Sequence, residues 1–291
     1  LLMPGMVNAH CHLELSHLYQ QIPKGTGLVD FVRSVGKLRT AAPEHIQESI
    51  RTAEHAIWER GILAVGDIVN TADTLAAKQA GKLNYHTLVE CFGLLENLAP
   101  QRMQHARDLW QQFSRLHPTS LTLHAPYSFS MTLLHLLKQE NKSTVFSIHN
   151  QECLAENELF QTGKGDFQRL FQDLFHKPYH FPLNGPGSLQ TIWPLLPRAP
   201  RTILVHNTCT STSDISMVMN DGRDTYWCLC PAANLYIEGR LPDVPLLLES
   251  GCKMVLGTDS LASNDRLDLF HEIDLLKSNF PQLPIATLLN W

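Results

Sequence analysis

The chain has 291 residues, of which 44% are hydrophobic and 18% charged, and its 23 basic and 28 acidic residues give a net charge of −5. This composition supports a large buried core and excludes a natively disordered chain. No long basic run is present, which argues against a nucleic-acid partner and a polybasic membrane surface. Histidine is unusually frequent, with 15 copies, more than packing or solubility requires.

Short β-rich stretches alternate with helical patterns along the whole chain. The predicted strands are residues 6–10, 62–69, 85–91, 121–124, 144–149, 202–206, 225–230 and 253–258. The predicted helices are residues 43–60, 71–80, 101–116, 131–141, 168–175, 211–220, 244–250 and 266–280. Several strands are continuously apolar, as parallel strands covered on both faces are. Eight strands in βαβα order predict an α/β fold with a parallel sheet and favour a (β/α)8 TIM barrel.

Two further features bear on the predicted barrel: the absence of glycine-rich phosphate motifs and a Pro-rich stretch. A doubly wound open sheet usually carries a phosphate-binding glycine turn after its first strand, and no G-x-G-x-x-G or G-x-x-x-x-G-K-[ST] motif is present. Residues 177–201 interrupt the alternation and contain six of the 17 prolines. We interpret this stretch either as a lid or pocket wall near the top of the barrel or as a surface insertion without a role.

The seven cysteines are odd in number and scattered along the chain, which argues against a disulfide framework. Cys228 and Cys230 lie in a predicted buried strand, and we interpret them as structural. No apolar run reaches the roughly 18 residues that a transmembrane helix needs, and the first residues lack the pattern of a signal peptide. We therefore expect a cytoplasmic protein.

Residues that carry chemistry in a barrel lie where its strands end, at the carboxyl-terminal face. Five histidines and one aspartate fall after predicted strands: His10, His12, His124, His149, His206 and Asp259. In an extended chain His10 and His12 point to the same side, so both imidazoles can bind one ion. With His149 they would form a three-nitrogen set that leaves a position open for water. Asp259 is a candidate ligand, a candidate proton acceptor, or both.

Other polar residues follow the candidate ligands. Glu152 comes three residues after His149 and suits general acid/base work, although a carboxylate is also favourable in the first turn of a helix. His206 ends an apolar strand and is a candidate for stabilising developing charge. Glu14 and Ser16 follow the H-x-H closely, so they line the pocket or merely support it.

Several motifs resemble the amidohydrolase superfamily. Residues 4–12 (Pro-Gly-Met-Val-Asn-Ala-His-Cys-His) resemble the opening strand of that superfamily. Further matches are residues 124–128, 149–152, 204–207, 230–234 and 257–260, which follow the order of the family over nearly the whole chain. The chain is similar to the branch of cytosine deaminases, chlorohydrolases and S-adenosylhomocysteine deaminases.

The resemblance implies a distorted barrel that holds one divalent metal ion, usually zinc and sometimes iron. It implies the metal ligands His10, His12, His149 and Asp259. It implies Glu152, His206 and Asp259 as catalytic residues and His124 and Asn234 as substrate contacts, although Ala232 and Ala233 stand where relatives often carry polar residues. Two-metal members carry a carboxylated lysine after the fourth strand, and residues 121–130 contain no lysine, so one metal is favoured.

The implied activity is hydrolytic deamination (EC 3.5.4-like) of an aminopurine or a related N-heterocycle, such as an adenosyl compound, an aminofutalosine-like compound or a cytosine-like base. A cyclic-amide hydrolase or chlorohydrolase of the same superfamily is one alternative, and a catalytically silent metal-binding protein is another. The unrelated small zinc deaminases need a C-x-x-C, which the chain lacks. The expected partner is a small heterocyclic substrate, with neither nucleic acid nor membrane, and a homo-oligomer is left open.

We expect residues 1–291 to form a single metal-dependent hydrolase barrel domain. Both ends of the sequence resemble cuts through a domain. Members of the superfamily usually carry a small β-sandwich built from segments before and after the barrel, and we expect these flanking segments to be missing from this chain.

Overall fold

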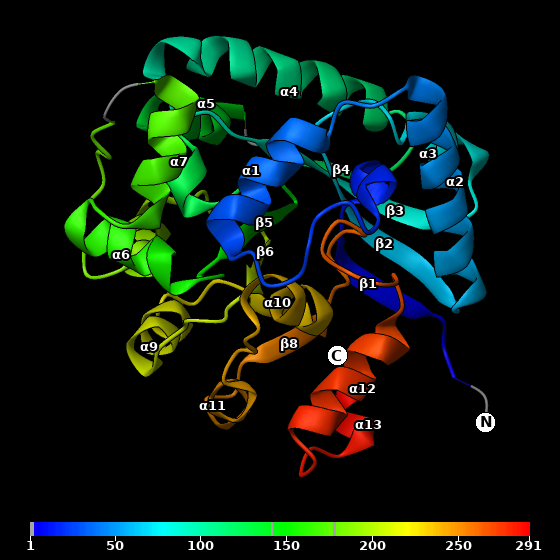
Figure 1. Cartoon of the computed structure of the whole chain (residues 1–291). Coiled ribbons are helices and arrows are strands. Elements are labelled where there is room, and N and C mark those ends of the chain that lie inside the picture. Colours follow the sequence, from blue (N-terminus) through cyan, green and yellow to red (C-terminus); the bar gives the residue numbers. More distant parts are fainter. Residues whose placement is uncertain (1–2, 141, 177–178) are drawn as a thin grey trace.

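The computed structural model of the chain describes residues 3–140, 142–176 and 179–291. Strands occupy the centre of the molecule and helices surround them (Figure 1). The strands are β1 (Met6–Cys11), β2 (Ile62–Val69), β3 (Asn84–Cys91), β4 (Thr119–Leu123), β5 (Val145–Asn150), β6 (Arg201–His206), β7 (Thr225–Leu229) and β8 (Lys253–Leu256). Every predicted strand is thus present near its predicted position.

The strands form two parallel four-stranded sheets, in the orders β1-β2-β3-β4 and β5-β6-β7-β8. Two irregular seams join them. At one seam, the backbone N–H of Thr258 donates to the His10 carbonyl oxygen at 3.0 Å. At the other, the backbone N–H of His149 donates to the His124 carbonyl oxygen at 2.9 Å. The predicted distorted (β/α)8 barrel is confirmed, and both seams carry candidate site residues.

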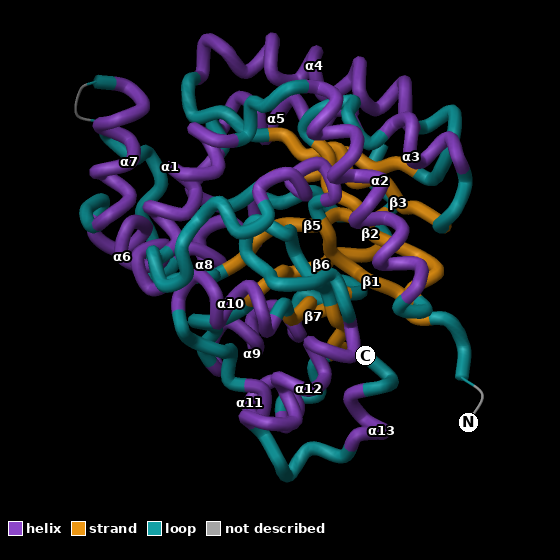
Figure 2. The backbone as a smooth tube through the Cα atoms, turned by 45° about the vertical axis from the view of Figure 1, so that its right-hand side comes forward, coloured by secondary structure: helices purple, strands orange, loops and turns teal. Residues whose placement is uncertain are grey.

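The helices cover the outside of the strands, as the tube in Figure 2 shows. They are α1 (Leu28–Leu38), α2 (Pro43–Glu59), α3 (Leu75–Ala80), α4 (Ala99–Phe113), α5 (Met131–Glu140), α6 (Leu154–Thr162), α7 (Asp166–Phe175), α8 (Ser188–Ile192), α9 (Thr212–Asn220), α10 (Pro231–Glu238), α11 (Val244–Glu249), α12 (Leu269–Asn279) and α13 (Ile285–Leu288). Short 3-10 turns include η1 (Leu13–Leu18), directly after β1. None of the helices in the described ranges has the length and apolar character that a membrane crossing requires.

Several helices differ from the prediction. The helices α1, α6, α8, α10 and α13 were not predicted. Pro231 in the first turn of α10 and the left-handed Gly239 after its end are nevertheless ordinary start and stop signals. α10 directly follows an apolar strand, which hides its boundary. The predicted helix 71–80 begins only at Leu75, because the Thr71 hydroxyl donates to Glu14 and Asp73 and holds the preceding residues in a turn.

Candidate metal centre and active site

Four side chains converge where the ends of β1, β5 and β8 meet. The Nε2 atom of His12 lies 3.1 Å from Nε2 of His10 and 3.3 Å from Nε2 of His149. The Oδ1 atom of Asp259 lies 3.4 Å from Nε2 of His12 and 3.5 Å from Nε2 of His10. All four residues are buried. The predicted ligand residues are thus together in space, although they are distant in the sequence.

These separations fit a bound divalent ion. Four tetrahedral ligand atoms, each about 2.1 Å from one zinc ion, lie about 3.4 Å from one another. The separations given above are close to that value. The donor set, imidazole nitrogens plus one carboxylate, is typical of catalytic zinc sites.

The protonation states also suit metal binding. Burial, followed by the nearby His10, lowers the pKa of His12 to about 3, and burial lowers the pKa of His149 well below its usual range. Burial alone would raise the pKa of Asp259, but the hydrogen bond from His10 and the nearby His12 outweigh it and hold this pKa well below its usual range. These shifts favour neutral imidazoles at His12 and His149 and an ionised carboxylate at Asp259, as metal ligation requires.

His206 lies beside this set. A wider cluster of donor atoms, all within 4.8 Å of one another, comprises His10, His149, His206 and Asp259. The ring of His206 is 5.4 Å from that of His149 and 6.1 Å from that of His10, measured between centroids. The shorter Nε2 contacts belong to His12, so the geometry favours His12 as the ligand and His206 as its neighbour.

The backbone around the site is strained. Gln151, His206, Asn207 and Asp259 have φ angles of 46°, 76°, 60° and 57°, in the left-handed region that costs energy for residues other than glycine. Side-chain hydrogen bonds hold part of this conformation, because the Asn207 amide donates to the Leu204 carbonyl oxygen at 2.8 Å. Such strain clusters at functional sites, where it is maintained by the surrounding structure.

Glu152 follows β5 and faces His206, with 3.6 Å between Oε1 of Glu152 and Nε2 of His206. Burial, followed by the charge of Asp259, raises the pKa of Glu152 well above its usual range. This direction favours the protonated form of Glu152, which a general acid needs. On the other side of the His206 ring, Nδ1 lies 3.0 Å from Nδ2 of Asn234.

Three of the predicted ligands, His12, His149 and Asp259, line a cavity of about 640 Å³. Glu152 and His206 line it as well. Apolar residues from α1, α7 and the loop after β3 form its outer wall: Leu28, Phe31, Val32, Val35, Phe92, Leu94, Leu95, Leu98, Leu170, Phe171, Leu174 and Phe175.

Of the predicted substrate contacts, one lines the cavity and three do not. His124 lines the cavity and its Nδ1 lies 3.0 Å from the Ser128 hydroxyl. Glu14 and Ser16 are buried outside the cavity lining, as is Asn234, which is held against His206. The Glu14 carboxylate accepts hydrogen bonds from the backbone N–H groups of residues 70 and 71 at 2.9 and 3.0 Å, and the Ser16 hydroxyl donates to the Leu13 carbonyl oxygen at 2.7 Å. Substrate contact by these three residues stays a prediction.

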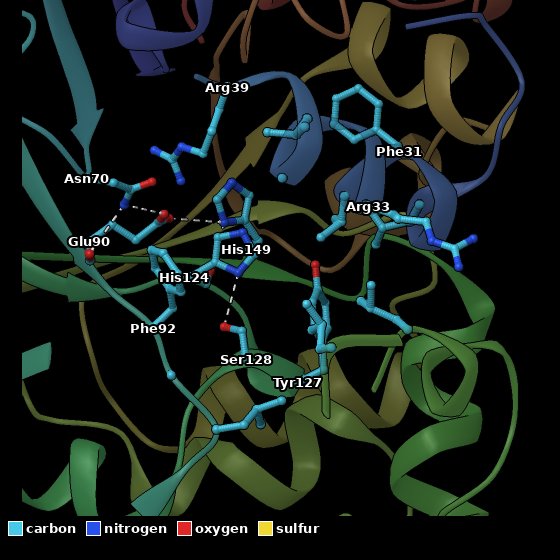
Figure 3. Close-up of a pocket in the computed structure, with 18 of the residues that line it drawn as sticks. Phe31, Arg33, Arg39, Asn70, Glu90, Phe92, His124, Tyr127, Ser128 and His149 are labelled. Carbon is cyan, nitrogen blue, oxygen red and sulfur yellow. Dashed lines mark hydrogen bonds and ion pairs between the residues drawn. The ribbon is translucent and has the colours of Figure 1, made fainter. Parts of the chain in front are cut away.

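The cavity also contains polar residues that the sequence did not single out. Figure 3 shows Arg39, Asn70 and Glu90 together on one side, next to His149 and His124. Phe31 and Arg33 lie on the opposite side (Figure 3). Glu90 stands at the end of β3, so the rule that functional residues follow strands applies to it as much as to the histidines.

Residues 177–201 do not line this cavity wherever the structure describes them, and residues 177–178 lie outside the described ranges. Phe181 is buried, with its ring stacked on that of Phe171 at 6.0 Å between centroids. Because Phe171 does line the cavity, the Pro-rich stretch supports the cavity wall from behind. Cys228 and Cys230, interpreted as structural, are fully buried.

A family model described as the amidohydrolase family matches residues 1–285. The chain is 26% identical over 294 residues to an adenosine deaminase of Helicobacter pylori. The matched region spans 99% of this chain and 71% of that protein. It is 27% identical over 304 residues to an aminodeoxyfutalosine deaminase of Deinococcus radiodurans, which covers 97% of this chain and 69% of that protein.

Solved structures share the fold. The crystal structure of Helicobacter pylori aminofutalosine deaminase in complex with methylthio-coformycin superposes with a TM-score of 0.86 and 22% identity, covering 98% of this chain and 70% of that chain. An adenosine deaminase from Xanthomonas campestris with bound zinc gives a TM-score of 0.71 and 19% identity, covering 95% of this chain and 61% of that chain.

Proposed function

This chain belongs to the amidohydrolase family, and on that premise we propose that it is a metal-dependent hydrolase that deaminates an adenine nucleoside or a close analogue. The observation that carries this proposal is the buried set of imidazoles and one carboxylate beside the buried carboxyl group of Glu152. The names of the relatives, which deaminate adenosine, 5′-deoxyadenosine or aminodeoxyfutalosine, support the substrate class.

We assign the metal ligands as His10, His12, His149 and Asp259. Zinc is the proposed ion, because the donor set is rich in nitrogen and because the Xanthomonas campestris structure contains zinc. When bound, such an ion supplies Lewis-acid activation of water at neutral pH.

Glu152, His206 and Asp259 move the protons of the reaction. Water adds to the ring carbon that bears the amino group, while Glu152 gives its proton to the adjacent ring nitrogen. Asp259 and His206 orient the water, accept its proton and return it to the amino group. The carbon–nitrogen bond to that group then breaks and ammonia leaves, while the new hydroxyl becomes a carbonyl and its proton restores Glu152. Asp259 is held for this task, because its Oδ2 accepts a hydrogen bond from the Ser263 hydroxyl at 2.6 Å while Oδ1 faces the histidines.

The cavity supports a substrate larger than a free base. Its volume of about 640 Å³ lies within the range that accommodates ligands of drug size. Apolar walls from α1 and α7 leave room for a sugar and a further substituent beyond the heterocycle. We also propose a cytoplasmic location, because all seven cysteines are free thiols and all but Cys209 are buried.

Ammonia release tests the proposal. Zinc-loaded protein is assayed with adenosine, 5′-methylthioadenosine, 5′-deoxyadenosine and aminodeoxyfutalosine. We expect at least one to release ammonia, a chelator to abolish the release and added zinc to restore it. Glu152→Gln should retain the metal and lose at least about a hundredfold in turnover, the scale of a general acid. Glu59→Gln, the same change at an exposed position of α2, is the matched control.

Two results would contradict the proposal. The first is metal-loaded protein that releases no ammonia from any of these compounds. The second is release of chloride from a chlorinated triazine, or ring opening of a cyclic amide, at a rate far above any deamination. Near-normal turnover of Glu152→Gln would remove Glu152 from its assigned role.

A further inference from the structure

Glu90 is a buried carboxylate with one unused oxygen. It stands at the end of β3, is only 5% exposed and lines the same cavity as the metal ligands. Its Oε2 accepts a hydrogen bond from the Asn70 amide at 3.0 Å. Its Oε1 has no hydrogen-bond partner among the described residues. A buried carboxylate oxygen without a donor is costly, so it calls for an explanation.

His149 does not supply the missing donor. Its Nδ1 lies 3.5 Å from Oε1 of Glu90 but only 2.7 Å from the His124 carbonyl oxygen. A His149 ring whose Nε2 faces the candidate ligand His12 has one N–H left to donate, on Nδ1. The shorter contact to the carbonyl uses that N–H, and Oε1 of Glu90 stays available.

A second metal ion does not explain Glu90 either. Donor atoms of Glu90, His124 and His149 lie within 4.8 Å of one another. However, His149 faces the first centre with Nε2 and the His124 carbonyl oxygen with Nδ1. Only one carboxylate and one imidazole are left, which is fewer than a zinc site uses.

The surroundings of Glu90 fit a ligand hydroxyl group. Asn70, Arg39 and His124 form a polar corner with Glu90 in a cavity whose outer wall is mostly apolar (Figure 3). A few polar groups placed in an apolar pocket usually orient the ligand. A carboxylate accepts O–H donors with charge-assisted hydrogen bonds, and acidic residues bind ribose hydroxyls in this way in nucleotide-binding folds.

We propose that Oε1 of Glu90 accepts a hydrogen bond from a sugar hydroxyl of the nucleoside substrate and so makes the enzyme select ribonucleosides over deoxynucleosides. This inference rests on the proposed function, because it concerns the same cavity. It makes Glu90 a specificity-determining residue that contacts the substrate away from the reacting carbon.

Substrate pairs that differ by one hydroxyl test the inference. We expect the native enzyme to favour adenosine over 2′-deoxyadenosine or 3′-deoxyadenosine by about 10- to 100-fold in kcat/KM, the effect of leaving a charged acceptor unpaired. Glu90→Gln should lower kcat/KM for adenosine and leave the discriminated deoxynucleoside nearly unchanged, so that the ratio falls severalfold. Glu90→Met, of similar size but without an acceptor, should bring the ratio close to one.

Binding of the reaction product gives a readout that does not depend on turnover. Calorimetric titration with inosine and the corresponding deoxyinosine should show the same loss of discrimination in both variants. Metal content should stay the same as in the native protein, and Glu59→Gln should keep the native ratio. If Glu90→Met does not fold, the Gln variant alone decides.

Three outcomes would overturn the inference. One is a native enzyme that treats ribo- and deoxynucleosides alike. The second is a ratio that survives in Glu90→Gln. The third is an equal loss for all substrates together with lost metal, which would make Glu90 a support for His149. All three presuppose ammonia release from at least one nucleoside, whereas its complete absence would contradict the proposed function itself.

Discussion

The metal centre and the ion pair between Lys78 and Asp67 are both buried polar clusters near β1 and β2. In the ion pair, opposite charges face each other, whereas in the metal centre imidazole nitrogens face one another. Nζ of Lys78 lies 2.6 Å from Oδ2 of Asp67 and donates to the Thr87 hydroxyl at 3.0 Å. The rings of Tyr85 and Phe113 lie 5.0 and 4.7 Å from the same ammonium. The two opposite charges of Lys78 and Asp67 therefore compensate each other inside the protein.

In the metal centre, by contrast, like atoms face one another. Nε2 of His12 lies 3.1 Å from Nε2 of His10 and 3.3 Å from Nε2 of His149, and one imidazole nitrogen cannot make both contacts as hydrogen bonds. We therefore interpret the Lys78–Asp67 pair as structural and the imidazole cluster as a site that a bound ion completes. Oε1 of Glu90, which has no hydrogen-bond partner among the described residues, is the acceptor that we propose for the substrate.

The largest expected effect comes from changing the incomplete cluster. His12→Gln removes one ligand nitrogen, so metal content should fall to a small fraction of one ion per chain. Turnover should fall by at least about a thousandfold, because the ion is worth several kcal/mol in the transition state. The free energy of unfolding of the metal-free protein should change little, since the contacts of Nε2 of His12 are to the other candidate ligands. Elemental analysis, ammonia release and urea unfolding measure the three quantities, and full metal content in this variant would contradict the ligand assignment.

The complete cluster should respond in the opposite way. Lys78→Met leaves the Asp67 carboxylate buried without its partner, which typically costs about 3–5 kcal/mol of unfolding free energy. Metal content under native conditions should stay near that of the unmodified protein. The double variant Asp67→Asn with Lys78→Met should recover part of the loss. A Lys78→Met protein of native stability would show that this pair is not the structural counterpart of the metal centre.

The sequence predicted which candidate ligands lie together better than it predicted their surroundings. Apolar runs mark the strands, and a barrel brings strand ends together, so His10, His149 and Asp259 could be assigned to one site from local patterns alone. Glu90 and Lys78 were missed because their roles depend on side-chain contacts between elements. Whether a buried polar group is satisfied is a property of packing, and no local pattern encodes it. For the same reason the wall formed by α1 was not predicted.

The buried carboxyl group of Glu272 should make the free energy of unfolding depend on pH. Burial raises the pKa of Glu272 to about 8, while its two oxygens accept hydrogen bonds from the backbone N–H of Ala232 and the amide of Asn264, both at 2.8 Å. Between the unfolded pKa near 4.5 and the folded pKa near 8, the folded state holds the proton that the unfolded state has lost. The free energy of unfolding contributed by this group therefore falls as pH rises through that window and is constant outside it.

Glu272→Gln cannot ionise and should remove this part of the slope. Urea unfolding of metal-free protein at pH 5 and pH 8.5 gives the two values to compare between the variant and the native chain. Equal slopes would show that Glu272 does not titrate in this window. The same comparison with Glu59→Gln, an exposed carboxylate, should leave the native slope in place.

The smallest expected effect concerns the start of α9, whose capping residues also hold Gln151. Ser211 caps α9, because its hydroxyl accepts from the backbone N–H of Asp214, and Asp214 in turn accepts from the Ser211 backbone N–H at 2.9 Å. The same Asp214 oxygen accepts from the Gln151 amide at 3.1 Å, next to Glu152. Ser211→Ala removes the cap and should cost about 1 kcal/mol of unfolding free energy. Turnover should not change, because Asp214 still holds Gln151. Asp214→Ala removes both the cap and the contact to Gln151, so it should reduce the free energy of unfolding and also kcat. A Ser211→Ala variant that loses turnover as strongly would show that the cap and the residues around Glu152 act as one unit.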